Sequence, residues 1–199
     1  KIIAAMTDAA ADLGVQAAPP DAIRNIIGLG LPEALRTLYP GIEDDGVAEM
    51  RQAYARRFIH SSHGLSPFFP GVEDTLAELA GMGAILAVAT GKSRKGLNRE
   101  LEARSLEGRF AHTRCADETA SKPDPTMLYE LLDEASKAVE QAVMIGDTLF
   151  DMDMAANANM RRLAVSYGAH DRDTLASSGP DLLIDDFSTI LDWVADNRF

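Results

Sequence analysis

Two carboxylates stand close together where a buried strand is expected to end. Asp147 follows the apolar run 142–145 after a single glycine, and Asp151 comes four residues later, on the first turn of the expected next helix. Like charges this close repel each other unless a cation lies among them. Mg²⁺ prefers oxygen ligands and needs few protein groups, so it is the natural candidate. The alternative is that Asp151 only stabilises the helix N-terminus, the role that we assign to Asp153.

A second polar group follows another apolar run, residues 84–89. Thr90, Gly91 and Lys92 come directly after this run and open a helical pattern. A hydroxyl, a flexible glycine turn and free helix N–H groups together can cradle a phosphate. An ordinary strand-to-helix turn has the same composition, so this motif alone leaves both interpretations open.

A lysine lies between turn-forming residues in the segment SKPDP, residues 121–125. On its own, Lys122 is typical of a solvated surface residue that precedes a helix. Its position among the motifs makes a functional role more plausible. A strand ending in Thr comes first, Lys-Pro-x-Pro second and a strand ending in Gly-Asp-x-x-x-Asp third. The order of the three motifs is a more specific signal of function than any one motif.

The hydrophobic pattern predicts the elements that must position these residues. Residues 1–67 show helical spacing only, whereas after residue 68 short apolar runs alternate with helical patterns. The expected strands are 84–89, 110–116, 142–145, 163–166 and 182–184. The first of them, being continuously apolar, is expected to be buried on both faces. Alternating strands and helices predict an α/β fold with a doubly wound parallel sheet, which binds ligands beyond the carboxyl ends of its strands.

Composition narrows the possible partners. The net charge of −12 argues against nucleic acid and against docking on anionic membranes, because both would be repelled. No stretch approaches the roughly 20 apolar residues of a transmembrane helix. The single cysteine, Cys115, fits a reducing compartment, so we expect a cytoplasmic protein. A small phosphorylated metabolite is still compatible with the acidic composition, because a few cations can dominate one pocket.

In their fixed order, the three motifs resemble motifs two, three and four of the haloacid-dehalogenase-like (HAD) superfamily, whose core is Rossmann-like. The leading helical block, 1–67, resembles the helical cap of its phosphoglycolate-phosphatase-like branch, including the Pro-Gly-Val entry at 70–72. The resemblance therefore covers nearly the whole chain. It implies a helical cap over 1–67 and an α/β core over 68–199.

The resemblance also implies a reaction, a cofactor and residue roles. The reaction would be hydrolysis of a small phosphorylated metabolite through an aspartyl-phosphate, with Mg²⁺ as the cofactor. Thr90 and the two residues after it would bind the phosphoryl group, and Lys122 would offset negative charge. Asp147 would bind the metal. Asp151 would either bind the metal through water or orient the lysine.

The family's first motif, Asp-x-Asp-Gly-Thr, has no match in the sequence. In the resembling branch this motif precedes the first cap helix, and here that helix begins near Lys1. We therefore expect the nucleophile and the first core strand to lie upstream, and residues 1–199 alone to be inactive. Alternatives on the same scaffold are a phosphomutase or a dehalogenase, although the intact Gly-Asp-x-x-x-Asp argues against a dehalogenase, which needs no Mg²⁺. A catalytically inactive binding module is the remaining alternative.

Further candidate residues carry less chemistry. His60 and His63 have no carboxylate cluster beside them, so we expect a loop rather than a metal pair. We interpret His112 and His170 in the same way, although His170, after Tyr-Gly, could lie near the rim of the cleft. Cys115 is expected to be a core residue rather than a nucleophile.

Overall fold

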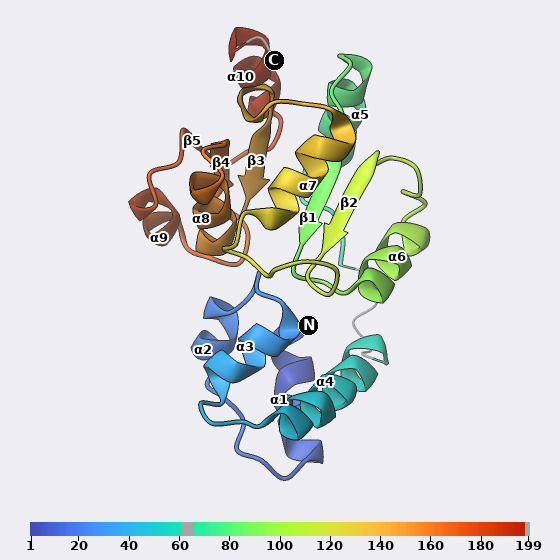
Figure 1. Cartoon of the computed structure of the whole chain (residues 1–199), viewed down its shortest axis with the longest axis vertical. Helices are drawn as coiled ribbons and strands as arrows, with labels where there is room; N and C mark the ends of the chain where they lie inside the picture. Colours follow the sequence, from blue (N-terminus) through green and yellow to red (C-terminus); the bar gives the residue numbers. More distant parts are fainter. Residues whose placement is uncertain (61–65, 198–199) are drawn as a thin grey trace.

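The computed structural model describes residues 1–60 and 66–197, which form two lobes stacked along the long axis of the molecule (Figure 1). The first lobe is helical. It consists of α1 (Ile2–Asp12), α2 (Pro20–Asn25), α3 (Leu31–Leu38) and α4 (Asp44–Ile59). No strand is found in the described part of this lobe, as the helical spacing of residues 1–67 predicts.

The second lobe alternates strands with helices. In chain order it contains α5 (Val72–Gly81), β1 (Ala87–Thr90), α6 (Arg94–Ala103), β2 (His112–Cys115), α7 (Thr126–Ala135), the 3₁₀ helix η1 (Val139–Gln141), β3 (Val143–Gly146), α8 (Leu149–Asn157), β4 (Arg161–Val165), α9 (Arg172–Ser177), β5 (Leu182–Ile184) and α10 (Thr189–Asn197). All strand pairs are parallel. The predicted parallel α/β class is confirmed.

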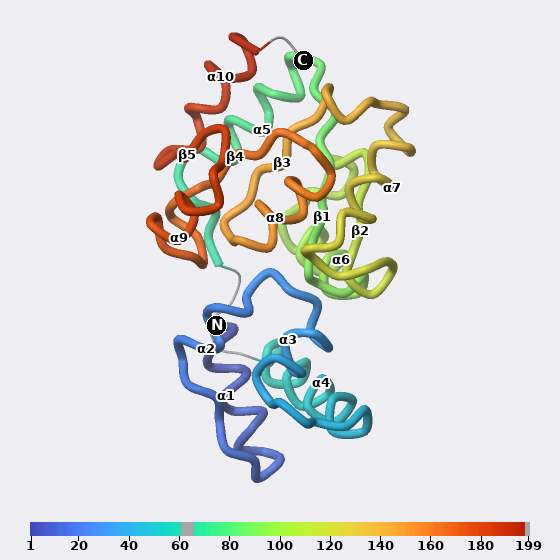
Figure 2. Tube along the Cα trace, turned by 60° about the vertical axis from the view of Figure 1, so that its left-hand side comes forward, coloured from blue at the N-terminus to red at the C-terminus, as the bar shows by residue number. Residues whose placement is uncertain are grey.

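The strands form two separate sheets, β1–β2 and β3–β4–β5. Strands β1 and β3 lie beside each other in the middle of the lobe without pairing (Figures 1 and 2). Within residues 1–60 and 66–197, each of them therefore has one edge that no strand covers. Such an edge presents backbone N–H and C=O groups that are ready to pair with another strand.

This arrangement corrects the prediction for residues 84–89. The strand begins only at Ala87, and Ile85 is 47% exposed. The prediction of a strand buried on both faces was therefore wrong. Ala87 is exposed and Val88 to Thr90 are only half-buried, and one edge of β1 has no neighbouring strand among the described residues.

The helical lobe has a hydrophobic core of its own. Its largest buried side chains are Met6 from α1, Ile23 from α2, Leu35 from α3 and Met50 from α4. The amphipathic helices therefore bury their apolar faces against one another rather than against the sheets. A boundary near residue 67 stays a prediction, because residues 61–65 are outside the described part.

In the second lobe, helices pack on the sheets and leave the strand ends facing the helical lobe. Met127 from α7 packs with Met154 from α8 and with Met160 before β4, in one of three apolar clusters of this lobe. The arrowheads of β1, β2 and β3 point toward the helical lobe (Figure 1). The carboxyl ends of the strands, where ligands bind in such folds, therefore face the helical lobe.

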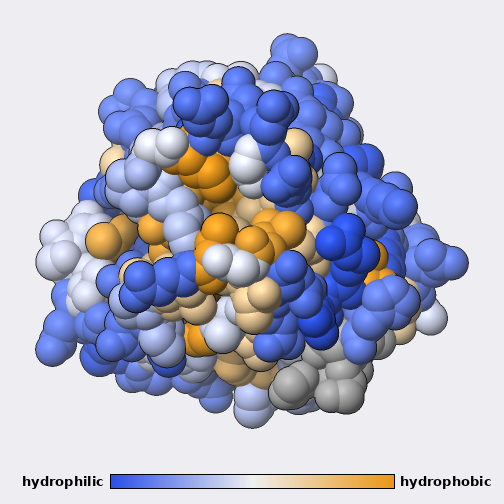
Figure 3. Space-filling view, turned by 90° about the horizontal axis from the view of Figure 1, so that it is seen from below, coloured by the Kyte–Doolittle hydropathy of each residue, from blue (hydrophilic) through white to orange (hydrophobic). Residues whose placement is uncertain are grey.

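Apolar side chains gather around a hollow at the free end of the helical lobe (Figure 3). A cavity of about 540 Å³ lies in this lobe, between the segment 15–19 and the segment 38–42. Within residues 1–60 and 66–197, every helix is too short or too polar to traverse a lipid bilayer.

The core of the helical lobe gives a stability prediction. Leu35 is fully buried there, so we expect Leu35→Ala to lower the free energy of unfolding by about 2–5 kcal/mol, the cost of a lost side chain and the cavity left behind. Urea denaturation measures this change. Val15→Ala, at a position that is 44% exposed, is the control and should shift it by less than about 0.5 kcal/mol. Equal effects of the two substitutions would contradict an independent core in this lobe.

Candidate active site

A buried ion pair lies at the carboxyl ends of the strands. The Lys122 ammonium group donates to Oδ1 of Asp151, and the two side chains are only 6% and 5% exposed. Removing two charges from water is costly, and only close pairing with further hydrogen bonds offsets that cost. Lys122 is therefore not the solvated surface residue that its turn-rich surroundings suggested on their own.

The Asp151 carboxylate is held on its other side by the start of its own helix. Its Oδ2 accepts hydrogen bonds from the Thr148 backbone N–H (3.1 Å) and from the Thr148 hydroxyl (2.8 Å). Both carboxylate oxygens are thus engaged, which favours the lysine-orienting role for Asp151 over metal binding. The approach is close, because a Cβ at Gly146 would lie 2.2 Å from the Asp151 Cβ. Only glycine fits at this end of β3.

Asp147 is half-buried, and only one of its two carboxylate oxygens accepts a hydrogen bond. Its Oδ2 accepts from the Ala169 backbone N–H at 2.7 Å, in the loop after β4. Within residues 1–60 and 66–197, no hydrogen bond reaches Oδ1. This oxygen is suited to a hard cation such as Mg²⁺. The described part of the chain contains no group of three His, Cys, Asp or Glu residues that could hold a metal without help.

The segment after β1 lies under the helical lobe. The Thr90 hydroxyl oxygen accepts from the Lys92 backbone N–H (3.2 Å). A Cβ at Gly91 would meet the carbonyl oxygens of Gly28 and Leu29 at 2.5 Å, so glycine is required where the two lobes touch. The Lys92 ammonium group lies 5.7 Å from the centre of the Phe58 ring, and desolvation there lowers the pKa of Lys92.

One loop of the helical lobe, residues 27–30, contacts all three motif segments of the core. It lies against Gly91, and its Gly30 N–H donates to the Ser121 hydroxyl at 2.8 Å, next to Lys122. A Cβ at Gly28 would lie 2.8 Å from the Thr148 hydroxyl. This loop of the helical lobe therefore lies directly against the strand ends. No local pattern in the sequence predicts the Gly30–Ser121 hydrogen bond, which joins residues 91 positions apart.

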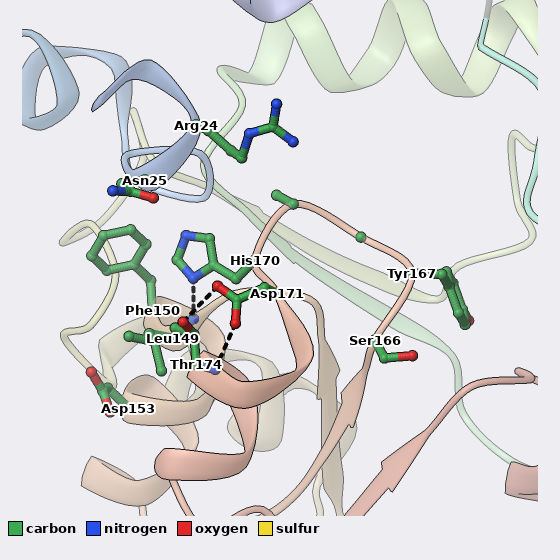
Figure 4. A pocket seen from close by; sticks show the side chains of 12 residues that line it. Arg24, Asn25, Leu149, Phe150, Asp153, Ser166, Tyr167, His170, Asp171 and Thr174 are labelled. Atoms are coloured by element: carbon green, nitrogen blue, oxygen red, sulfur yellow. Dashed lines mark hydrogen bonds between the residues drawn. The ribbon is translucent and has the colours of Figure 1, made fainter. Parts of the chain in front are cut away.

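A cavity of about 570 Å³ lies between α2 and the core (Figure 4). Arg24 and Asn25 line it from the cap, Leu149 and Phe150 line it from the start of α8, and the segment 166–171 closes it behind β4. Its volume is within the range of small-molecule sites, roughly 300–1,000 Å³. Asp147 does not line the cavity, but its carboxylate accepts from Ala169 N–H, in the loop that does.

His170 is a functional candidate that sequence reasoning placed only at a cleft rim. Its ring is 7% exposed, and Nδ1 accepts from the Leu149 backbone N–H at 3.0 Å. The other ring nitrogen, Nε2, is buried and has no hydrogen-bond partner in the part of the chain that the structure describes. No periodicity or motif in the sequence predicts the contact between His170 and Leu149.

The other candidates have structural roles. His112 lies 3.2 Å from Glu134, and His60 ends α4, whereas His63 lies outside the described residues. Cys115 is fully buried, and desolvation raises the pKa of its thiol to about 11. Since the thiolate is the reactive form, this cysteine is unsuited to nucleophilic attack.

Fold and site together define a class: a parallel α/β protein with a helical lobe over its strand ends and with a lysine, a hydroxyl and carboxylates at those ends. Comparison with known proteins agrees. Residues 1–165 match the family model described as haloacid dehalogenase-like hydrolase. The chain belongs to this family.

Two curated relatives are similar over most of their length. A phosphoglycolate phosphatase of Vibrio cholerae is 30% identical over 96% of this chain and 88% of its own. A probable phosphatase of Dickeya dadantii, IndB, is 34% identical over 96% of this chain and 84% of its own. The family thus includes relatives named as phosphatases.

Solved structures support the same fold. A hydrolase from Pseudomonas syringae superposes with a TM-score of 0.87 at 20% identity, over 98% of this chain and 90% of that one. A predicted phosphoglycolate phosphatase from Haemophilus somnus gives a TM-score of 0.82 at 23% identity, over 97% and 90%. At such identities the likeness shows the fold alone.

The buried ion pair gives a second prediction. We expect Asp151→Asn to lower the free energy of unfolding by about 3–5 kcal/mol, because it leaves the Lys122 charge buried without a partner. Chemical denaturation at neutral pH measures the change. Asp153→Asn, the same substitution at an exposed position of the same helix, should change it by no more than about 0.5 kcal/mol. If Asp151→Asn lowered the free energy of unfolding no more than its control, the Lys122–Asp151 pair would not stabilise the fold.

Proposed function

We propose that this protein is a Mg²⁺-dependent phosphomonoester hydrolase that acts on a small metabolite through an aspartyl-phosphate. The observation that carries the proposal is the buried lysine at the strand ends. Lys122 is held in place by Asp151, beneath a cap loop that contacts every motif segment. A fixed positive charge in a site shielded from water is what a transferring phosphoryl group requires.

The nucleophilic aspartate, in this proposal, is carried by a strand upstream of Lys1. The unpaired facing edges of β1 and β3 support it, because one further strand between them would join the two sheets. The N-terminus lies between the two lobes, near the carboxyl ends of these strands (Figure 1). A strand entering from there would place the residues after it beside Asp147 and Lys122.

Mg²⁺ would bind at the free Oδ1 of Asp147, with further oxygen ligands from the upstream segment and from water. The donor chemistry fits, because Asp147 is a half-buried carboxylate whose orientation is fixed by Ala169. When bound, Mg²⁺ would neutralise charge on the phosphate and on the nucleophile. Asp151, whose oxygens are both engaged, would contribute by holding the lysine.

The residues of this chain have distinct tasks in the proposed reaction. Lys122 would donate to an oxygen of the phosphoryl group and keep the nucleophile and the phosphate from repelling each other. The Thr90 hydroxyl, which accepts from Lys92 N–H, keeps its own proton for a phosphoryl oxygen. The cap loop 27–30 would exclude water while the phosphoryl group is transferred. The cytoplasmic location expected from composition stays a prediction.

Turnover of p-nitrophenyl phosphate tests the proposal. We expect the full-length gene product to hydrolyse it with Mg²⁺, and EDTA to abolish the activity. Asp147→Asn should lower kcat/KM on the order of 10²–10³-fold, because it removes a charge that acts on the reacting phosphate. Asp192→Asn, the same substitution at an exposed position on α10, is the matched control and should leave activity unchanged.

Residues 1–199 alone are expected to show no turnover. Hydrolysis by this segment alone, or full activity of Asp147→Asn, would contradict the proposed mechanism. Preferential turnover of 2-haloacids over phosphate esters would replace it with a dehalogenase.

A further inference from the structure

We propose that Ser121 is a positioning residue that couples the helical lobe to Lys122, and that Glu33 competes with it for the same hydrogen bond. The Gly30 N–H is bound by Ser121 when the lobes are closed and by Glu33 when they are apart. This inference rests on the proposed phosphatase function and deepens it, because it concerns when the lysine is held in place for the phosphoryl group.

The contact between the lobes at Gly30 is a well-formed hydrogen bond. The Gly30 N–H donates to the Ser121 hydroxyl oxygen at 2.8 Å, where the loop of the helical lobe meets the segment before α7 (Figure 1). The approach is close, because a Cβ at Gly30 would lie 3.1 Å from both the Ser121 hydroxyl oxygen and the Ala116 Cβ. Glycine at position 30 therefore lets the backbone of one lobe reach a side chain of the other.

Ser121 is one of three points at which the segment before α7 is held. The ammonium group of the next residue, Lys122, pairs with Asp151 on α8. The carbonyl oxygen of Pro123 accepts from the Asn157 side chain at 3.0 Å, at the end of the same helix. These two contacts lie within one lobe, whereas the contact through Ser121 comes from the other lobe. Closure of the lobes therefore adds a constraint on the backbone directly beside the lysine.

Glu33 offers the same N–H a second acceptor. Gly30 is the N-cap residue of α3, and Glu33 is the third residue of that helix. A glutamate at this position can accept from the backbone N–H of the N-cap residue, as in a capping box. A Cβ at Gly30 would lie 2.5 Å from Oε2 of Glu33, so the carboxylate already lies over Gly30. In the structure the N–H is bound by Ser121 rather than by this carboxylate.

Two acceptors for one donor make the hydrogen bond exchangeable. When the lobes part, the Gly30 N–H passes from Ser121 to Glu33 and keeps a partner within the protein, which lowers the cost of opening. One hydrogen bond of ordinary strength changes a two-state equilibrium by about two- to tenfold. Ser121 and Glu33 therefore act on the same equilibrium in opposite directions.

The separation of the lobes in the full-length protein tests the exchange without relying on turnover. Spin labels at Arg51→Cys on α4 and Asp192→Cys on α10, both exposed positions, report the distance between the lobes by double electron–electron resonance. Cys115 is fully buried and is not accessible to the label.

The two acceptors should shift the lobes in opposite directions. We expect Ser121→Ala to lower the ratio of closed to open molecules about two- to tenfold, and Glu33→Ala to raise it by a similar factor. Glu33→Gln keeps a carbonyl oxygen that can accept from Gly30, so it should leave the ratio close to that of the wild type. Glu49→Ala, the same change as Glu33→Ala at an exposed position on α4, is the control for lost charge.

Steady-state kinetics with p-nitrophenyl phosphate and Mg²⁺ give a second readout. The KM should rise in Ser121→Ala and fall in Glu33→Ala, because the fraction of protein in the competent state scales the apparent affinity. Opposite shifts of the lobes without phosphatase turnover would overturn the proposed function but not the exchange. Turnover with no shift in either variant, or with shifts of the same sign, would overturn the exchange alone.

Discussion

The buried pair of Lys122 and Asp151 is the constraint on which the rest of the site depends. A lysine shielded from water is tolerated only with its partner, and that partner is fixed by the Thr148 cap of α8 and by the absence of a side chain at Gly146. The pair therefore ties the loop before α7 to the first turn of α8, just after β3. The loop after β4 joins the same point through Asp147. Three loops thus meet at the strand ends, where they place the positive charge of Lys122 near the carboxylate of Asp147.

The helical lobe completes this arrangement from the opposite side. Its own core makes it a separate packing unit, yet its loop 27–30 contacts the core at Gly91, Ser121 and Thr148. A substrate between the lobes would be enclosed by groups from both, which is how a cap excludes water and selects ligands. The chemistry belongs to the strand ends, whereas the choice of substrate would belong to the cap.

Much of this could be predicted from sequence, because strand ends in a parallel sheet are marked by polar residues after apolar runs. The order of the motifs was enough to identify the family, and the spacing of apolar residues in 1–67 predicted helices. The roles of Lys122 and Asp147 stay predictions that the geometry supports. Burial could not be predicted, because it depends on distant partners. Residues 84–86 are apolar like a buried strand, but they precede β1 and Ile85 is 47% exposed. His170 contacts Leu149 and lines a cavity beside α2, and no local pattern reveals either.

Trapping the covalent intermediate tests the central claim most directly. The full-length protein would be mixed with substrate and Mg²⁺, quenched with borohydride, which reduces an aspartyl-phosphate to homoserine, and mapped by peptide mass spectrometry. The account predicts one homoserine, at an aspartate upstream of Lys1, with Asp147 and Asp151 unmodified. Reduction at Asp147 or Asp151, or active enzyme with no trapped aspartate at all, would contradict it.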